Sequence, residues 1–140
     1  MPKRADNYCV GEEFKPLTFT VTPDFNYHYC LAVEGCHERY TTGTCNKPPL
    51  VHPALLIFYS NVTRSPSFYL PQGMAAVHAK EEIKFISPAL VGKTFTVYWK
   101  VVEVYEKRGR CYQVKDTLML DEGDKQILKR IITDTYFSGS

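Results

Sequence analysis

The sequence predicts an α+β protein in which an antiparallel sheet wraps around one central helix. The first observation is a segment, residues 54–62, that is apolar around nearly its whole circumference. A helix of that kind belongs inside a protein, and this one is too short to cross a bilayer. The second observation is the region of residues 76–137, where strand-forming runs alternate with tight-turn signatures. Strands joined by short turns pair antiparallel, so we expect one sheet.

The N-terminal part predicts a strand followed by a helix. Residues 17–21 alternate apolar and polar side chains, as a half-buried strand does. Thr22 suits the N-cap of a helix, Pro23 suits its first position, and Gly35 suits its end. We expect three residues to share the buried face of this helix: Tyr27, Leu31 and Ala32.

A loop, the central helix and the strands follow in that order. Residues 36–50 are rich in turn-forming residues and predict a loop, after which Pro53 opens the central helix. The sheet is expected to have about five or six strands. The predicted strand segments are residues 76–78, 83–86, 94–105, 111–120 and 125–137. The longest hairpin is expected to turn at Lys107 to Arg110, and residues 121–124 predict a second tight turn.

Composition indicates one globular domain spanning residues 1–140, with its core at about 14–137. Of the 140 residues, 44% are hydrophobic and 23% are charged, which is the balance of a soluble protein. The net charge of +2 comes from scattered basic residues, so no nucleic-acid partner is expected. No apolar run approaches the roughly 20 residues that span a bilayer, so no membrane partner is expected either.

The cysteines and the N-terminus predict a cytoplasmic protein. The first residues carry charges but no apolar segment of the kind found in a secretory signal. The 5 cysteines are odd in number and form no CxxC pair. Reduced thiols are therefore expected in place of a disulfide framework.

The strand region resembles the MaoC-like hydratases and dehydratases, which have the hotdog fold. The resemblance is carried by VHAKEEIKFISPALVGKTFTV (77–97) and VYEKRGRCYQVKDTLMLDEGDKQIL (104–128). VTPDFNYHYCLAV (21–33) is similar to the first helix of the same family. The resemblance covers residues 14–137 and implies a hotdog fold, with an antiparallel sheet around one helix.

The resemblance also implies an activity and partners. Family members act on thioesters of coenzyme A (acyl-CoA) or acyl carrier protein, without a cofactor or metal, and assemble from two hotdog units. The implied partners are thus an acyl thioester and a second hotdog subunit, in a homodimer or a heteromer. A carboxylate and an imidazole activate one water for reversible hydration of an enoyl thioester. The start of the central helix polarises the thioester carbonyl, and His52 and Pro53 occupy that position here.

The residues that match the catalytic positions of the family differ from the family pattern. The pattern Gly-Asp-x-Asn-Pro-x-His places Gly35 at the Asp position, His37 at the Asn position and Tyr40 at the His position. Both catalytic groups would then be missing. Asp24 and Asn26 form a similar Asp-x-Asn pair, but it comes at the start of the helix and is interpreted as a coincidence.

Each candidate site residue has a second reading. His37 and Glu38 form either a replacement acid–base pair or solvated loop residues, and Tyr40 is predicted to line the pocket because a phenol is a poor base at neutral pH. His52 either contacts the thioester substrate or caps the central helix. His78 lies either near the acyl chain or among satisfied core residues.

A zinc site is the weaker alternative for the loop that follows the first helix. Its candidate ligands would be Cys36, His37, Cys45 and His52, because zinc prefers Cys and His. No two of these share a short ligand spacing, so we expect no metal.

Three functions remain open from the sequence. The chain is a non-catalytic subunit that shapes the acyl pocket of a catalytic partner, or it catalyses hydration with His37 and Glu38. The third possibility is a stand-alone acyl-CoA binding or regulatory module.

Overall fold

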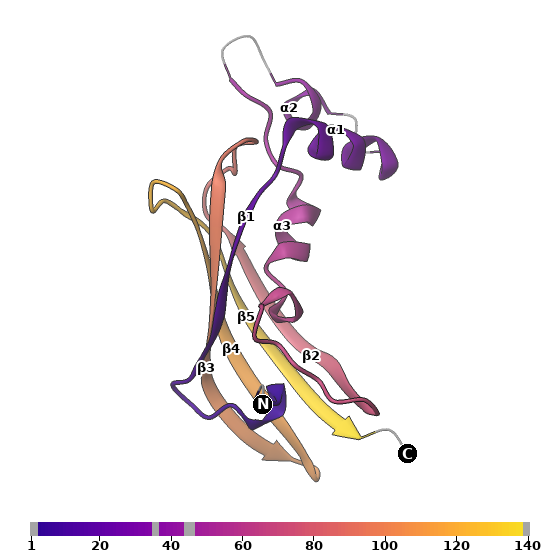
Figure 1. The fold of residues 1–140 in the computed structure, drawn as a ribbon, viewed down its shortest axis with the longest axis vertical. Coiled ribbons are helices and arrows are strands. Elements are labelled where there is room, and N and C mark those ends of the chain that lie inside the picture. The colour runs from indigo at the N-terminus through magenta and orange to yellow at the C-terminus, as the bar shows by residue number, and fades with distance from the viewer. Residues whose placement is uncertain (1–2, 35–36, 44–46, 139–140) are drawn as a thin grey trace.

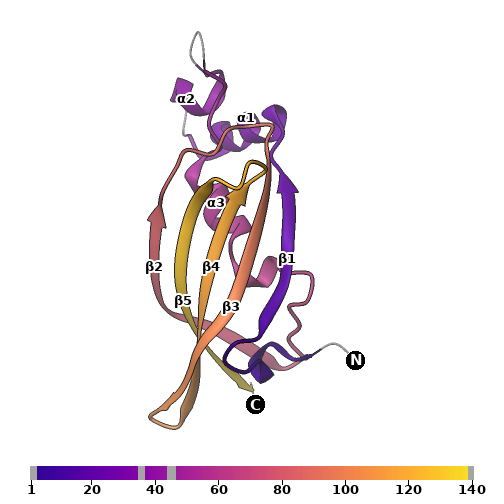
Figure 2. The same ribbon diagram turned by 90° about the vertical axis from the view of Figure 1, so that its left-hand side faces the viewer.

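The computed structural model describes residues 3–34, 37–43 and 47–138. In these residues one strongly curved antiparallel sheet of five strands holds a short helix, α3, on its concave side (Figures 1 and 2). The strand order is β1-β3-β4-β5-β2, so β1 and β2 form the edges. The elements are η1 (Ala5–Asn7), β1 (Glu13–Thr20), α1 (Pro23–Ala32), α2 (Glu38–Thr41), α3 (Pro53–Tyr59), η2 (Val62–Arg64), β2 (Met74–Phe85), β3 (Thr94–Lys107), β4 (Arg110–Asp121) and β5 (Gln126–Ser138).

The predicted strands are present, and their alternation builds the core. On β3 every second side chain points to the concave side and is buried: Phe95, Val97, Trp99 and Val101. Leu55 and Leu56 of α3 are buried in the same hydrophobic cluster. The β3–β4 hairpin turns where predicted, at Arg108 and Gly109, both of which have positive φ. Two predicted segments, 76–78 and 83–86, are parts of one continuous strand, β2, whose register shifts between His78 and Lys80.

The sheet wraps around α3 as predicted but leaves one side of the helix uncovered. Ile57 and Phe58 of α3 are 37% and 44% exposed. The reason is geometric, because one curved sheet reaches around only part of a helix. The side of α3 that faces away from the sheet therefore stays apolar and open.

The buried face of α1 also differs from the prediction. Tyr27 and Leu31 are 40% and 45% exposed, and Ala32 is exposed too, whereas Asn26 and Cys30 are buried. Thr22 caps the helix as predicted, accepting a hydrogen bond from Phe25 N. The apolar residues point outward because α1 is fixed from its other side by the polar side chain of Asn26. Within the predicted loop 36–50, α2 forms one additional turn of helix.

Two buried side chains of the sheet hold the C-terminal end of α3. Trp99 Nε1 donates to the carbonyl oxygen of Ser60 at 2.8 Å, and Arg130 Nη1 donates to the carbonyl oxygen of Ile57 at 2.9 Å. Arg130 is 2% exposed, and Glu81 of β2 balances its charge at 2.7 Å. Because the last carbonyls of a helix lack partners within the helix, these bonds satisfy groups that burial would otherwise leave unpaired.

We expect Arg130→Met to destabilise the fold by about 3 kcal/mol, because it removes the partly buried ion pair with Glu81 and the hydrogen bond to the carbonyl oxygen of Ile57. Urea unfolding followed by tryptophan fluorescence measures the change. Lys107→Met, on the exposed hairpin, is the control and should change the unfolding free energy by less than about 0.5 kcal/mol. Equal effects of the two substitutions would show that the Arg130 contacts do not hold α3.

Candidate functional site

A groove of about 300 Å³ lies between α2, the start of α3 and the segment that follows β2. Tyr40 and Pro53, two of the candidate site residues from the sequence, line it. The other lining residues are Arg39, Leu50, Val51, Leu56, Phe85, Ile86, Ser87, Pro88 and Ala89. The groove is thus mainly apolar, with one guanidinium and one phenol among its side chains, a composition typical of small-molecule sites.

Asn26 fixes the wall of the groove from behind. Its amide nitrogen donates to the carbonyl oxygens of Tyr40 and Leu50, and its amide oxygen accepts a hydrogen bond from the backbone N–H of His52 at 3.0 Å. One side chain, 1% exposed, therefore ties α1 to α2 and to the start of α3. Cys30, one turn further along α1, directs its thiol to the same Tyr40 carbonyl at 3.8 Å.

His52 caps α3, which was one of its two predicted roles. Its Nδ1 accepts a hydrogen bond from the backbone N–H of Ala54 at 3.1 Å. The ring lies 5.4 Å from the ring of Tyr29 and 5.5 Å from the ring of Tyr40, measured between centroids. Pro53 has no N–H, and the N–H of Leu55 bonds to the carbonyl oxygen of His52 at 2.9 Å. The donors that a thioester carbonyl would use are therefore engaged within the chain.

His37 and Glu38 lie on the exposed side of α2. His37 Nδ1 accepts a hydrogen bond from the backbone N–H of Arg39 at 3.1 Å and so caps the helix. Both side chains are exposed, and no ion pair or hydrogen bond joins them among the described residues. The ring of His37 lies 6.1 Å from that of Tyr40.

Part of the sequence-based site falls outside the described residues. Gly35, at the position of the family's catalytic Asp, is one such residue. Cys36 and Cys45, two of the four possible zinc ligands, are the others. Within the described ranges, no group of three or more Cys, His, Asp or Glu side chains is arranged to hold a metal ion.

His78 lies away from this groove, on the concave side near the C-terminal end of α3. It lines a smaller cavity of about 170 Å³ together with residues of η2, β2 and β5. Its Nε2 is 3.0 Å from Oε1 of Glu81, and its Nδ1 is 3.8 Å from Oδ1 of Asp134. His78 thus has polar partners in the sheet and is separate from the groove at α3.

A buried lysine, Lys115, contacts Asp134. Lys115 is 0% exposed, and its Nζ lies 2.6 Å from Oδ2 of Asp134 and 3.0 Å from the hydroxyl of Tyr136. Burial lowers the pKa of Lys115, and the charge of Asp134 opposes that shift. Burial also raises the pKa of Tyr136, with Asp134 acting in the same direction. The cluster keeps a paired ammonium in the core.

Sequence reasoning missed Asn26 and Asp134. Asn26 was noticed only as part of an Asp-x-Asn pair, whereas its role depends on three backbone groups that are distant in the sequence. Asp134 lies in a strand whose apolar pattern gave no sign of an ion pair. For Asn26, the only signal that the sequence offers is a polar residue at a position on the inner face of α1.

Comparison with known proteins identifies the fold. No protein-family model and no curated protein sequence matches the chain. A monoamine oxidase regulatory protein from Archaeoglobus fulgidus has a similar structure, with a TM-score of 0.78 and 16% identity over 100% of this chain and 99% of that one. A MaoC-like dehydratase from Rhodospirillum rubrum gives a TM-score of 0.77 and 11% identity, covering 97% of each chain.

A chain of the HadBC (3R-hydroxyacyl-ACP dehydratase) complex from Mycobacterium tuberculosis is also similar. It gives a TM-score of 0.67 and 16% identity over 94% of this chain and 99% of that one. These matches show that the chain has the α+β hotdog fold found in MaoC-like dehydratases. In the part of the chain that the structure describes, no helix is long and apolar enough to cross a membrane.

We expect Asn26→Ala to lower the unfolding free energy by about 2–4 kcal/mol, because the backbone groups that it binds would be left buried without partners. Chemical unfolding of wild type and variant measures this. The matched control is Asn7→Ala at an exposed position, where a change below about 0.5 kcal/mol is expected. A similarly small loss for Asn26→Ala would mean that water replaces the amide.

Proposed function

We propose that this chain is a MaoC-like hydratase/dehydratase family protein that handles acyl thioesters as a non-catalytic or partner-dependent subunit. The acyl chain is carried by coenzyme A or acyl carrier protein. The proposed setting is fatty-acid metabolism in the cytoplasm. The hotdog fold supports this assignment, because two of the similar structures are described as dehydratases.

The residues that line the groove support the proposal that the chain alone is a poor catalyst. Water activation in this chemistry needs a carboxylate and an imidazole placed together. The described lining of the groove contains neither. Tyr40, which the resemblance aligns with the imidazole, is among the lining residues. The nearby imidazoles of His37 and His52 use Nδ1 to cap α2 and α3. This arrangement fits binding of an acyl group better than addition of water to it.

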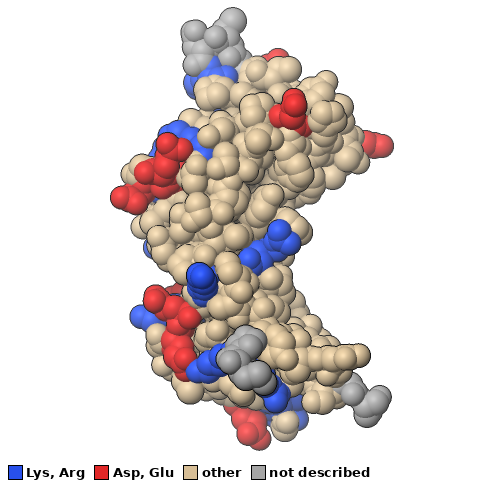
Figure 3. Space-filling view, in the orientation of Figure 1, with Lys and Arg blue, Asp and Glu red and all other residues tan. Residues whose placement is uncertain are grey.

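The open side of α3 supports a partner. Six large apolar side chains on α1, α3 and the end of β2 are 37–49% exposed: Phe25, Tyr27, Leu31, Ile57, Phe58 and Phe85. Figure 3 shows few charged side chains over this part of the surface. β2 next to it is a long edge strand with an unpaired side. An apolar face beside an open edge is typical of an interface. A second hotdog subunit, as in the HadBC complex, would cover both.

The purified chain alone is expected to hydrate crotonyl-CoA at least about 100-fold more slowly than an active hydratase, because acid–base catalysis contributes roughly 10²–10⁴-fold. Acyl-CoA should nevertheless raise its melting temperature. Loss of enoyl absorbance and a thermal-shift assay measure the two effects.

Robust turnover would contradict the non-catalytic proposal. If that turnover disappeared in Glu38→Gln or His37→Ala but not in the exposed control Glu103→Gln, these two residues would be the replacement pair. If acyl-CoA stabilised a chain that associates with no second hotdog protein, the stand-alone binding module would be favoured.

We expect the chain to be a dimer or part of a heteromer at micromolar concentration. Ile57→Asp should shift a homodimer towards monomer, because it places a charge in the proposed apolar interface. Light scattering coupled to size exclusion measures the mass. Val104→Asp, on the exposed β3–β4 hairpin, is the control and should leave the mass unchanged. A monomeric wild-type chain that also fails to co-purify with a partner would contradict the prediction.

A further inference from the structure

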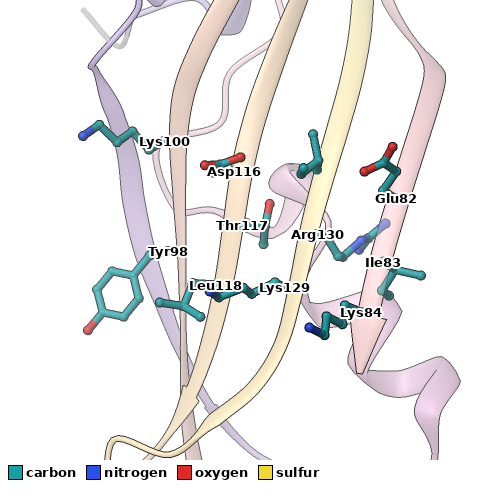
Figure 4. Close-up of a pocket in the computed structure, with 11 residues that line it drawn as sticks. Glu82, Ile83, Lys84, Tyr98, Lys100, Asp116, Thr117, Leu118, Lys129 and Arg130 are labelled. Carbon is teal, nitrogen blue, oxygen red and sulfur yellow. The ribbon is translucent and has the colours of Figure 1, made fainter. Parts of the chain in front are cut away.

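A second hollow lies on the opposite, convex face of the sheet. It measures about 610 Å³, within the range of small-molecule pockets. Side chains of four neighbouring strands surround it in two rows, which Figure 4 shows. The first row is Lys84, Lys129, Leu118 and Tyr98, and the second is Glu82, Ile131, Asp116 and Lys100. We call this site the convex hollow.

Two lysines occupy opposite positions on neighbouring strands at one end of the convex hollow, and Figure 4 shows the side chain of Lys129 running towards Leu118. Lys84 of β2 pairs with Lys129 of β5 in the strand register, and both side chains are exposed. Like charges placed directly opposite each other destabilise a sheet. Among the described residues neither lysine forms an ion pair within 4.0 Å, although Glu82 is two residues from Lys84 on the same strand. The position is therefore suited to an anion that bridges the two ammonium groups.

The remainder of the first row and the centre of the second are apolar. Tyr98 is 42% exposed and Ile131 is 43% exposed, while Leu118 lies partly buried between them and the lysines. The carboxylate of Asp116 is placed opposite Lys100 in the register, so their opposite charges offset each other. Lys84 and Lys129 together with Glu82 leave one net positive charge at this end of the hollow, beside an apolar floor.

The described lining of the convex hollow carries two carboxylates, Glu82 and Asp116, but no carboxylate–imidazole pair of the kind that activates water. It contains no histidine or cysteine, and its one buried cation, Arg130, is already bonded to Glu81. Binding without chemistry is the function that fits this lining.

We propose that the convex hollow binds an amphipathic anion, with a carboxylate or phosphate between Lys84 and Lys129 and an apolar body on Leu118, Ile131 and Tyr98. Charge complementarity selects the head group, and the volume and the apolar floor select the body. This site is separate from the groove at α3 and does not depend on the function proposed above.

Displacement of anilinonaphthalene sulfonate, a fluorescent amphipathic anion, by decanoate and by octyl phosphate tests the proposal. Both should compete, and the stronger competitor identifies the preferred head group. Octyl glucoside, which has a similar apolar body but no charge, should compete weakly. Lys84→Gln and Lys129→Gln should each weaken binding by about fivefold, as expected for a partly solvated charge pair. High salt should weaken wild-type binding as well.

Stability separates lost binding from lost folding. Lys129→Gln removes the like-charge pair, so the ligand-free variant should melt at the same temperature as wild type or higher. Lys107→Gln, at the exposed end of β3, is the control and should leave binding unchanged. Amide chemical shifts should move at Leu118, Lys129 and Ile131 on addition of decanoate.

Three outcomes would overturn the proposal. The first is unchanged affinity in the Lys84→Gln/Lys129→Gln double variant, and the second is shift changes confined to α3. The third is a change in oligomeric state in the double variant with no ligand binding to wild type, which would make the convex hollow a contact between two copies of the chain.

Discussion

The structure depends on how a seven-residue helix is held at both ends. A helix this short leaves most of its backbone donors and acceptors without partners inside the helix. At its start, His52 caps the helix and Asn26 holds His52. At its end, Trp99 and Arg130 bind the backbone. Because burial of unpaired backbone groups is costly, these four side chains are what allow α3 to lie against the sheet at all.

The same arrangement creates the asymmetry of the molecule. Anchors at the two ends fix α3 without covering it, so Ile57 and Phe58 remain on the surface. The groove at the start of α3 opens beside this apolar side. A ligand in the groove and a partner on the apolar face would therefore be neighbours.

The sequence predicted the strands well because alternation reports directly on which side chains meet the core. The sequence was a less reliable guide for α1. Tyr27 and Leu31 were predicted to lie on the buried face, but Asn26 and Cys30 are the buried residues. A hydrophobic pattern cannot indicate that a polar anchor decides the orientation. Of the candidate site residues, Tyr40 and Pro53 line one groove and His78 lines another cavity. The sequence could not indicate this arrangement, because it depends on strand register and not on local sequence.

The register shift and the charges of β2 affect how the edge of the sheet behaves in the isolated chain. Its register shift near His78 interrupts the regular edge, and Glu81 places a charge towards the inner side of the sheet. Lys80, Glu82 and Lys84 add charges on the other side. Bulges and charges of this kind prevent an edge strand from adding to any passing strand. The irregular, charged edge thereby limits non-specific strand pairing and so the aggregation of the chain.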